Sequence, residues 1–68
     1  MDKKVIITPR KTTMEFALNE KTVIVKAKFS AGSAVVDRLD FAKQLSTLSN
    51  QEKKDIEDEM KNRGIGLD

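Results

Sequence analysis

The sequence predicts an α+β fold in which an antiparallel sheet of two or three strands is followed by a helical hairpin. Apolar and polar side chains alternate with a period of two in the first 29 residues, as they do in half-buried strands. After residue 33 the apolar positions recur every three or four residues, which is the spacing of one helix face. A capping sequence beginning at Ser49 then indicates a second helix. The length of 68 residues suits one domain, which we expect to span 1–68.

The expected strands cover about residues 3–8, 12–18 and 21–29. They are rich in Val, Ile, Thr and Phe, which suit a half-buried pleated surface. Pro9 cannot donate a hydrogen bond to a neighbouring strand, so the first strand should end there or lie at an edge. Whether this first segment joins the sheet decides between two strands and three.

The second and third segments fit a hairpin with a turn centred on Asn19-Glu20. This turn places Phe16 opposite Val23 and Met14 opposite Val25, so that apolar side chains share one face. A shift of one residue would destroy the match, because it moves every side chain to the other face. The pattern therefore predicts the register of the hairpin as well as its existence.

The first helix is expected over about 34–48, after a break at Ser30–Ser33. Ser33 can cap it by accepting a backbone N–H bond. The apolar residues that follow lie close together at helical spacing and continue the face that the strands begin. The predicted core therefore contains Phe16, Val23, Val25, Leu39, Ala42 and Leu45.

The second helix is expected over about 50–63. Ser49 and Glu52 have the spacing of a capping box, in which each side chain bonds a backbone N–H of the other. Gly64 is placed to end the helix in the left-handed conformation, with Ile65 folding back on Met60. The interior is otherwise highly charged, so this helix should lie on the surface with a thin apolar seam.

The residue types exclude several kinds of chemistry. The chain has no cysteine and no histidine, which excludes disulfides, thiolate nucleophiles and the usual zinc sites. The carboxylates of the expected helices are interleaved with Lys and Arg, as on a solvated helix face. No glycine-rich phosphate loop is present. We therefore expect no enzyme, and no catalytic, cofactor-binding or metal-binding residues.

Location and self-association follow from length and hydropathy. No apolar run approaches the roughly 20 residues that cross a bilayer, and the N-terminal apolar stretch is too short for a signal peptide. We expect a cytoplasmic protein with no membrane partner. A core of this size supplies only about 3–5 kcal/mol, so a homodimer is the expected source of further stability.

The first functional hypothesis is a small non-catalytic module that binds another protein. Such a module would act as a regulator, an inhibitor or an assembly component, and its partner is not identified by any motif. The hypothesis depends on a small core, a wide apolar stripe on the first helix and a charged second helix, and mainly on the weakness of the rival functions. Aromatic residues, which often dominate binding energy at interfaces, are scarce, with three Phe and no Trp or Tyr. The expected partners are the chain itself and an unidentified protein.

The alternative hypothesis is a dimeric DNA-binding regulator. The order of a strand (about 22–29) and two helices (about 33–48 and 50–63) resembles the ribbon-helix-helix architecture. That resemblance implies paired strands from two subunits in the major groove of duplex DNA, and the residues that would contact it are Thr22, Lys26 and Lys28. It ranks second because the expected hairpin already pairs this strand with residues 12–18.

Overall fold

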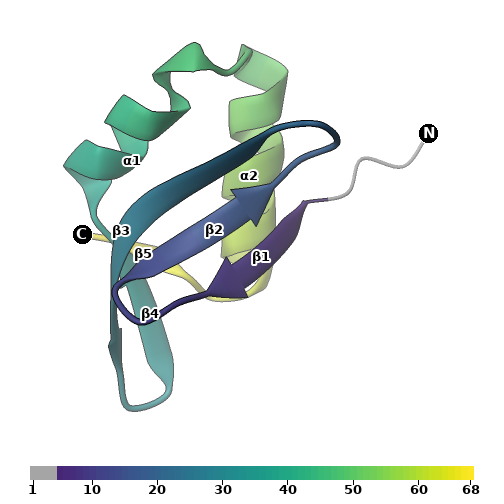
Figure 1. Cartoon of the computed structure of the whole chain (residues 1–68). Coiled ribbons are helices and arrows are strands. Elements are labelled where there is room, and N and C mark those ends of the chain that lie inside the picture. The colour runs from purple at the N-terminus through teal and green to yellow at the C-terminus, as the bar shows by residue number, and fades with distance from the viewer. Residues whose placement is uncertain (1–4) are drawn as a thin grey trace.

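In the computed structural model, which describes residues 5–68, five strands form one mixed sheet that is accompanied by two helices and a single 3₁₀ turn (Figure 1). The strands are β1 (Ile6–Pro9), β2 (Thr13–Ala17), β3 (Thr22–Ser30), β4 (Ser33–Val36) and β5 (Gly66–Leu67). The helical segments are α1 (Arg38–Gln44), the 3₁₀ turn η1 (Leu45–Thr47) and α2 (Asn50–Asn62). The α+β class predicted from the sequence is therefore confirmed, although the sheet has more strands than expected.

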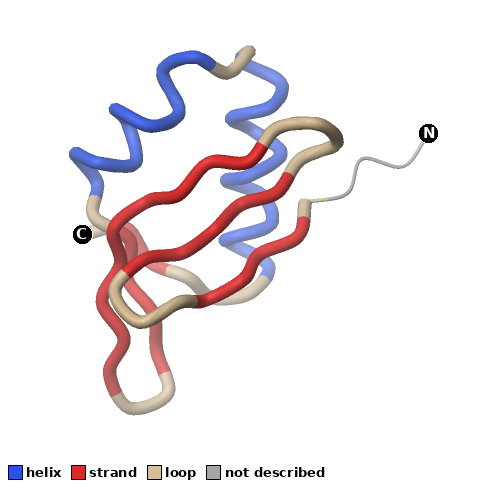
Figure 2. The backbone as a smooth tube through the Cα atoms, in the orientation of Figure 1, coloured by secondary structure: helices blue, strands red, loops and turns tan. Residues whose placement is uncertain are grey.

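The spatial order of the strands is their order along the chain, β1 to β5. β1 to β4 form an antiparallel meander, and β5 pairs with β4 in parallel. The tube in Figure 2 shows how the β3–β4 hairpin extends past the turn that joins β1 to β2. β3 is long enough to have two partners, because it pairs with β2 over residues 22–26 and with β4 over residues 27–30.

The predicted hairpin is confirmed in its register. Phe16 pairs with Val23 and Met14 pairs with Val25. The turn is closed by a hydrogen bond of 2.7 Å from the N–H of Leu18 to the carbonyl oxygen of residue 21. The first expected strand does join the sheet, as β1, and Pro9 is its last residue. Residues 3 and 4 of that expected strand lie outside the described residues.

The expected helix over 34–48 is wrong at both ends. At its C-terminal end α1 stops at Gln44, the turn η1 follows, and Leu48 is extended. At its N-terminal end residues 33–36 form strand β4 instead, after a tight turn in which Gly32 has a φ of 79°. The β-branched pair Val35-Val36 suits a strand, and Val36 is completely buried there. The cap of α1 is therefore Asp37 and not Ser33, since the Asp37 side chain accepts hydrogen bonds from the first backbone N–H groups of the helix.

Helix α2 confirms both predicted end signals. The Ser49 hydroxyl accepts the N–H of Glu52 at 3.2 Å, and the Glu52 carboxylate accepts the N–H of Ser49 at 2.9 Å. At the other end Gly64 has a φ of 72°. The N–H of Ile65 then donates to the carbonyl of Met60 at 2.9 Å, which gives the six-to-one bond of a Schellman motif.

The core lies between the inner face of the sheet and the helical layer. It contains twelve buried apolar residues, namely Val5, Ile7, Met14, Phe16, Val25, Ala27, Val36, Phe41, Leu45, Leu48, Ile56 and Met60. The predictions for Phe16, Val25 and Leu45 are confirmed, and Val23 is partly buried against the same cluster.

The predictions for Leu39 and Ala42 are wrong, because both are exposed and Leu39 is 82% accessible. Since α1 begins four residues later than expected, a different stripe faces the sheet. In place of Leu39 and Ala42, Phe41 is the residue of α1 that is buried against the sheet. Its ring contacts that of Phe16 edge-on, with 6.3 Å between the ring centroids.

A candidate interaction surface on the uncovered sheet face

One face of the sheet has no second layer over it in the part of the chain that the structure describes. In Figure 1 helix α2 lies behind β1, β2 and β3, and the opposite side of these strands faces the viewer. Alternation along β3 assigns the side chains to the two faces, since Val25 and Ala27 are buried whereas Ile24, Lys26 and Lys28 are exposed. We call the exposed side the outer face.

The three residues that the sequence suggested for nucleic-acid contact all lie on the outer face. Thr22, Lys26 and Lys28 are exposed on β3. The two lysines are neighbours on that face, whereas Thr22 lies four residues from Lys26 at the start of the strand. Within residues 22–63 the strand–helix–helix order of the resemblance is not kept, because β4 follows β3 and pairs with it.

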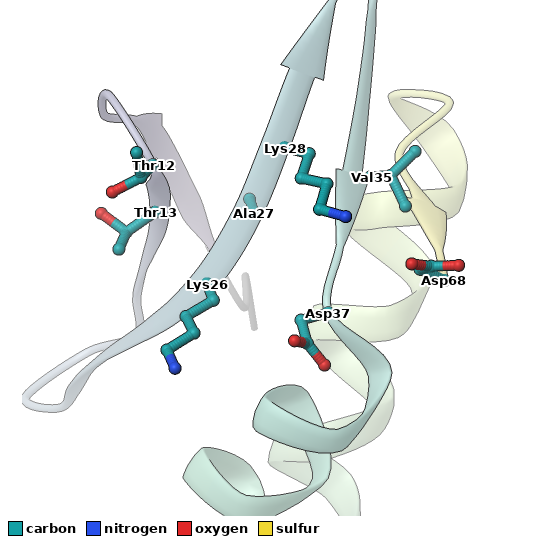
Figure 3. Close-up of a pocket in the computed structure, with 8 residues that line it drawn as sticks. All are labelled: Thr12, Thr13, Lys26, Ala27, Lys28, Val35, Asp37 and Asp68. Carbon is teal, nitrogen blue, oxygen red and sulfur yellow. The ribbon is translucent and has the colours of Figure 1, made fainter.

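The two lysines border a hollow of about 490 Å³ at the position where β3 changes partner (Figure 3). Lys26 pairs with Thr13 of β2, and Lys28 pairs with Val35 of β4. Figure 3 shows two threonines on one side of β3 and three further residues on the other. The complete lining is Thr12, Thr13, Lys26, Ala27, Lys28, Val35, Asp37 and Asp68.

Neither lysine ammonium forms a salt bridge with any described residue. The ion pairs of residues 5–68 lie elsewhere and join Arg10 to Glu15 at 2.6 Å, Lys21 to Glu52 at 3.1 Å and Arg63 to Glu59 at 2.9 Å. The hollow therefore presents two cationic groups, together with threonine hydroxyls that can donate or accept hydrogen bonds. It can bind an anionic or strongly polar group.

Two acidic side chains near the hollow, those of Asp37 and Asp40, have structural partners on α1 and β3. Asp37 accepts two N–H groups at the start of α1, at 3.0 and 3.3 Å. Asp40 accepts the backbone N–H of Lys26 at 2.9 Å, and this bond is the main reason that the pKa of its carboxyl is lowered. Desolvation raises the pKa by less than this bond lowers it. A bond from Gln44 and the charges of Lys26 and Lys43 each lower the pKa by a still smaller amount.

The opposite end of the outer face is apolar. Ile6 is 53% exposed and Ile24 is 52% exposed, values that are high for residues of this size on a sheet. Ala17 on β2 pairs with Ile6 and with Thr22, so it is a diagonal neighbour of Ile24, which itself pairs with Glu15. We call Ile6, Ala17 and Ile24 the apolar patch. The outer face therefore combines an apolar part and a cationic part along the same strand.

The sequence identified the two lysines of this surface but missed most of the residues around them. Thr13 could have been found, because the predicted hairpin register places it opposite Lys26. Val35 and Asp37 were missed because residues 34–48 were assigned to a helix. Asp68 reaches the hollow through β5, where its N–H donates to the carbonyl of Val36 at 2.9 Å, and no local pattern indicated that pairing.

No metal site is found among the described residues, and no relative is identified among known proteins. Residues 5–68 contain no group of three or more His, Cys, Asp or Glu side chains that could hold a metal ion. Over the same residues no helix has the length and apolar character to cross a membrane. In comparisons with known proteins, the chain matches no protein-family model, no curated protein and no solved structure.

Proposed function

We propose that this chain is a small non-catalytic domain that binds a partner protein through its outer sheet face. The observation that carries the proposal is the half-exposed pair Ile6 and Ile24 on a face that no described element covers. An antiparallel sheet can have one face in water, but that face is then usually polar. Large apolar side chains gathered there, next to polar residues, are typical of a protein contact.

Such a domain would act as a regulator, an inhibitor or an assembly component. We place it in the cytoplasm because the sequence contains no cysteine to stabilise it by disulfides. We also propose that the chain forms a homodimer, since a core of twelve side chains leaves a small margin of stability. Mass measurement in solution over a range of protein concentrations tests this part, and a monomer at all concentrations would contradict it.

The binding face can be tested with two variants that make the same chemical change. Ile24→Asp introduces a charge into the apolar patch. Leu39→Asp introduces the same charge at an apolar side chain that is 82% exposed on α1 and is not part of that patch. Each protein, immobilised and shown to be folded by circular dichroism, is used to capture partners from cell extract. The proposal expects a partner retained by the unaltered chain and by Leu39→Asp but lost by Ile24→Asp. Equal retention by all three would contradict it.

Duplex DNA is the second candidate partner. The observation that favours it is that Lys26 and Lys28 are adjacent on the outer face without a salt bridge to a described residue, with Thr22 on the same strand. DNA binding through these residues would weaken steeply as salt is raised, because each phosphate contact releases counterions. It would also weaken when Lys26 and Lys28 are replaced by Ala. If binding to duplex DNA changed neither with salt nor with the Ala substitutions at Lys26 and Lys28, DNA binding through these residues would be excluded.

A further inference from the structure

We infer that the hollow around Lys26 and Lys28 binds acidic side chains of the partner, and that the partner segment carries apolar side chains next to its carboxylates. The inference rests on the proposed function, because it assigns the chemistry of a partner for the same outer face. It is carried by three observations, which are the arrangement of side chains along β3, the absence of a salt bridge from Lys26 or Lys28 to a described residue, and the position of the aromatic rings.

Alternate residues of β3 form a short series from apolar to cationic. Ile24, Lys26 and Lys28 all project from the outer face, and each step of two residues covers about 7 Å. The apolar patch and the hollow are therefore within about 14 Å of each other along one strand. A single short peptide segment can cover both. It would place apolar side chains over Ile24 and Ile6, and carboxylates near the two ammonium groups.

The charges around the hollow favour individual carboxylate side chains of a partner over a continuous row of phosphates. The carboxylates closest to the lysines along the chain have structural roles, because Asp37 caps α1 and Asp40 bonds the N–H of Lys26. Glu15, on the neighbouring strand, is paired with Arg10 at 2.6 Å. Neither lysine forms a salt bridge with a described carboxylate, so both ammonium groups can bind an incoming anion. Charge-assisted hydrogen bonds to carboxylates are among the strong polar contacts.

The same surroundings disfavour nucleic acid. Asp37 and Asp68 also line the hollow, so a continuous row of phosphates would meet two carboxylates as well as two lysines. Single-stranded nucleic acids usually stack their bases on aromatic side chains. Phe16 and Phe41 are buried, and Phe29 alternates with the outward lysines and so lies on the inner side of β3. A short protein segment with one or two carboxylates presents less negative charge to those aspartates than a continuous row of phosphates does.

The experiment follows amide shifts of isotope-labelled protein by NMR during titration with defined probes. The first probe is a glutamate-rich peptide with interspersed leucines, the second has serine in place of each leucine, and the third is a generic DNA duplex. The variant Lys26→Gln/Lys28→Gln removes two charges from the hollow. Its matched control, Lys54→Gln/Lys61→Gln, removes two charges from exposed positions of α2.

The inference expects the leucine-containing peptide to bind more tightly than the serine version and to shift residues around the hollow and the apolar patch. The Lys26→Gln/Lys28→Gln variant should weaken this binding by roughly three- to tenfold, and the α2 control should leave it within about twofold. Equal losses in the two variants would overturn the inference, because the attraction would then be general. Tighter binding of duplex DNA with the same lysine dependence would also overturn it, as would no binding of either peptide.

These results separate the inference from the function on which it rests. Lys26→Gln/Lys28→Gln and its α2 control could lose the same peptide affinity while Ile24→Asp still loses the captured partner. In that case the outer face binds protein, but the hollow does not select carboxylates. If Ile24→Asp retains the partner as well, the proposed function is contradicted independently of the peptides.

Discussion

The carboxylate of Asp40 accepts a hydrogen bond of 2.9 Å from the backbone N–H of Lys26, although the two residues lie in different layers. The last backbone bond between β3 and the β4 side runs from the N–H of Asp37 to the carbonyl of Lys26. The chain then turns into α1, and the carbonyl of Asp37 accepts the N–H of Phe41 instead. The Asp40 side chain therefore supplies the acceptor that a longer β4 would have offered, and it attaches α1 to the sheet.

Replacing Asp40 by Ala should lower the melting temperature and speed hydrogen exchange at the Lys26 amide, because that N–H loses its acceptor. Asp40→Asn keeps a carbonyl oxygen at the same position and should lose less. Thermal melts and amide exchange of both variants provide the measurement. Asp58→Ala, a change of the same kind on the exposed side of α2, is the control and should leave both quantities unchanged. Normal exchange at Lys26 in Asp40→Ala would mean that the bond is not formed.

Acid should destabilise the fold through two carboxyls. The backbone N–H of Lys26 lowers the pKa of Asp40 from the ordinary value of 3.8, and the backbone N–H of Ser49 lowers the pKa of Glu52 from 4.5. A pKa that is lower in the folded state stabilises the fold at pH values above the unfolded pKa. This stabilisation is lost as the pH falls through the folded pKa.

The urea midpoint should therefore start to fall as the pH drops toward 4.5 and continue to fall below 3.8. The double variant Asp40→Asn/Glu52→Gln should show a flatter dependence over the same range, because neither side chain then titrates. An equally steep dependence in the double variant would assign the effect to other carboxyls.

Leu45 and Leu39 form a matched pair on the helical segment. Leu45 is 2% exposed in the core, and Leu45→Ala should cost about 2–5 kcal/mol of unfolding free energy because it leaves a cavity. Leu39 is 82% exposed, and Leu39→Ala should stay within about 0.5 kcal/mol of the unaltered protein. Urea unfolding of the two variants measures both values. A cost of Leu39→Ala as large as that of Leu45→Ala would show that α1 faces the sheet with the stripe expected from the sequence.

Gly64→Ala should destabilise the protein by about 1–2 kcal/mol, because its φ of 72° places an L side chain in the left-handed region. The strain is conformational and not steric, since a Cβ at this position would meet nothing within 4 Å. Gly66→Ala is the control, where a Cβ would make an ordinary contact of 3.8 Å with a methyl group of Val35. It should cost clearly less in the same thermal or urea assay.

The features that the sequence predicted correctly have a local physical cause. The register of β2 and β3 follows from apolar side chains that must share one face, and Phe16 opposite Val23 is its direct result. The capping box at Ser49 and the left-handed Gly64 depend on hydrogen bonds among residues close in the chain. Such features can be predicted without knowing what packs on them.

The errors at residues 33–48 arose where two periodicities compete. Val35, Leu39 and Leu45 match helical spacing, yet the tight turn before Ser33 and the β-branched Val35-Val36 pair fit a second hairpin. Pairing of β4 with β3 and β5 decides the outcome, and that pairing involves residues far apart in the sequence. The hollow was missed for the same reason, because it is lined by β2, β3 and β4 together with the loop before β2, the cap of α1 and the residue after β5.

The strand order β1 to β5 has a consequence for how the chain reaches its native state. Each antiparallel pair joins segments that are adjacent in the chain, so these contacts close only short loops and can form quickly. The parallel pair is different, because α1, η1 and α2 all lie between Val35 and Gly66 in the sequence. These two residues can pair only after the helices have packed. The closing of β5 onto β4 should therefore be the slowest contact to form and the first to open, and with it Asp68 enters or leaves the hollow.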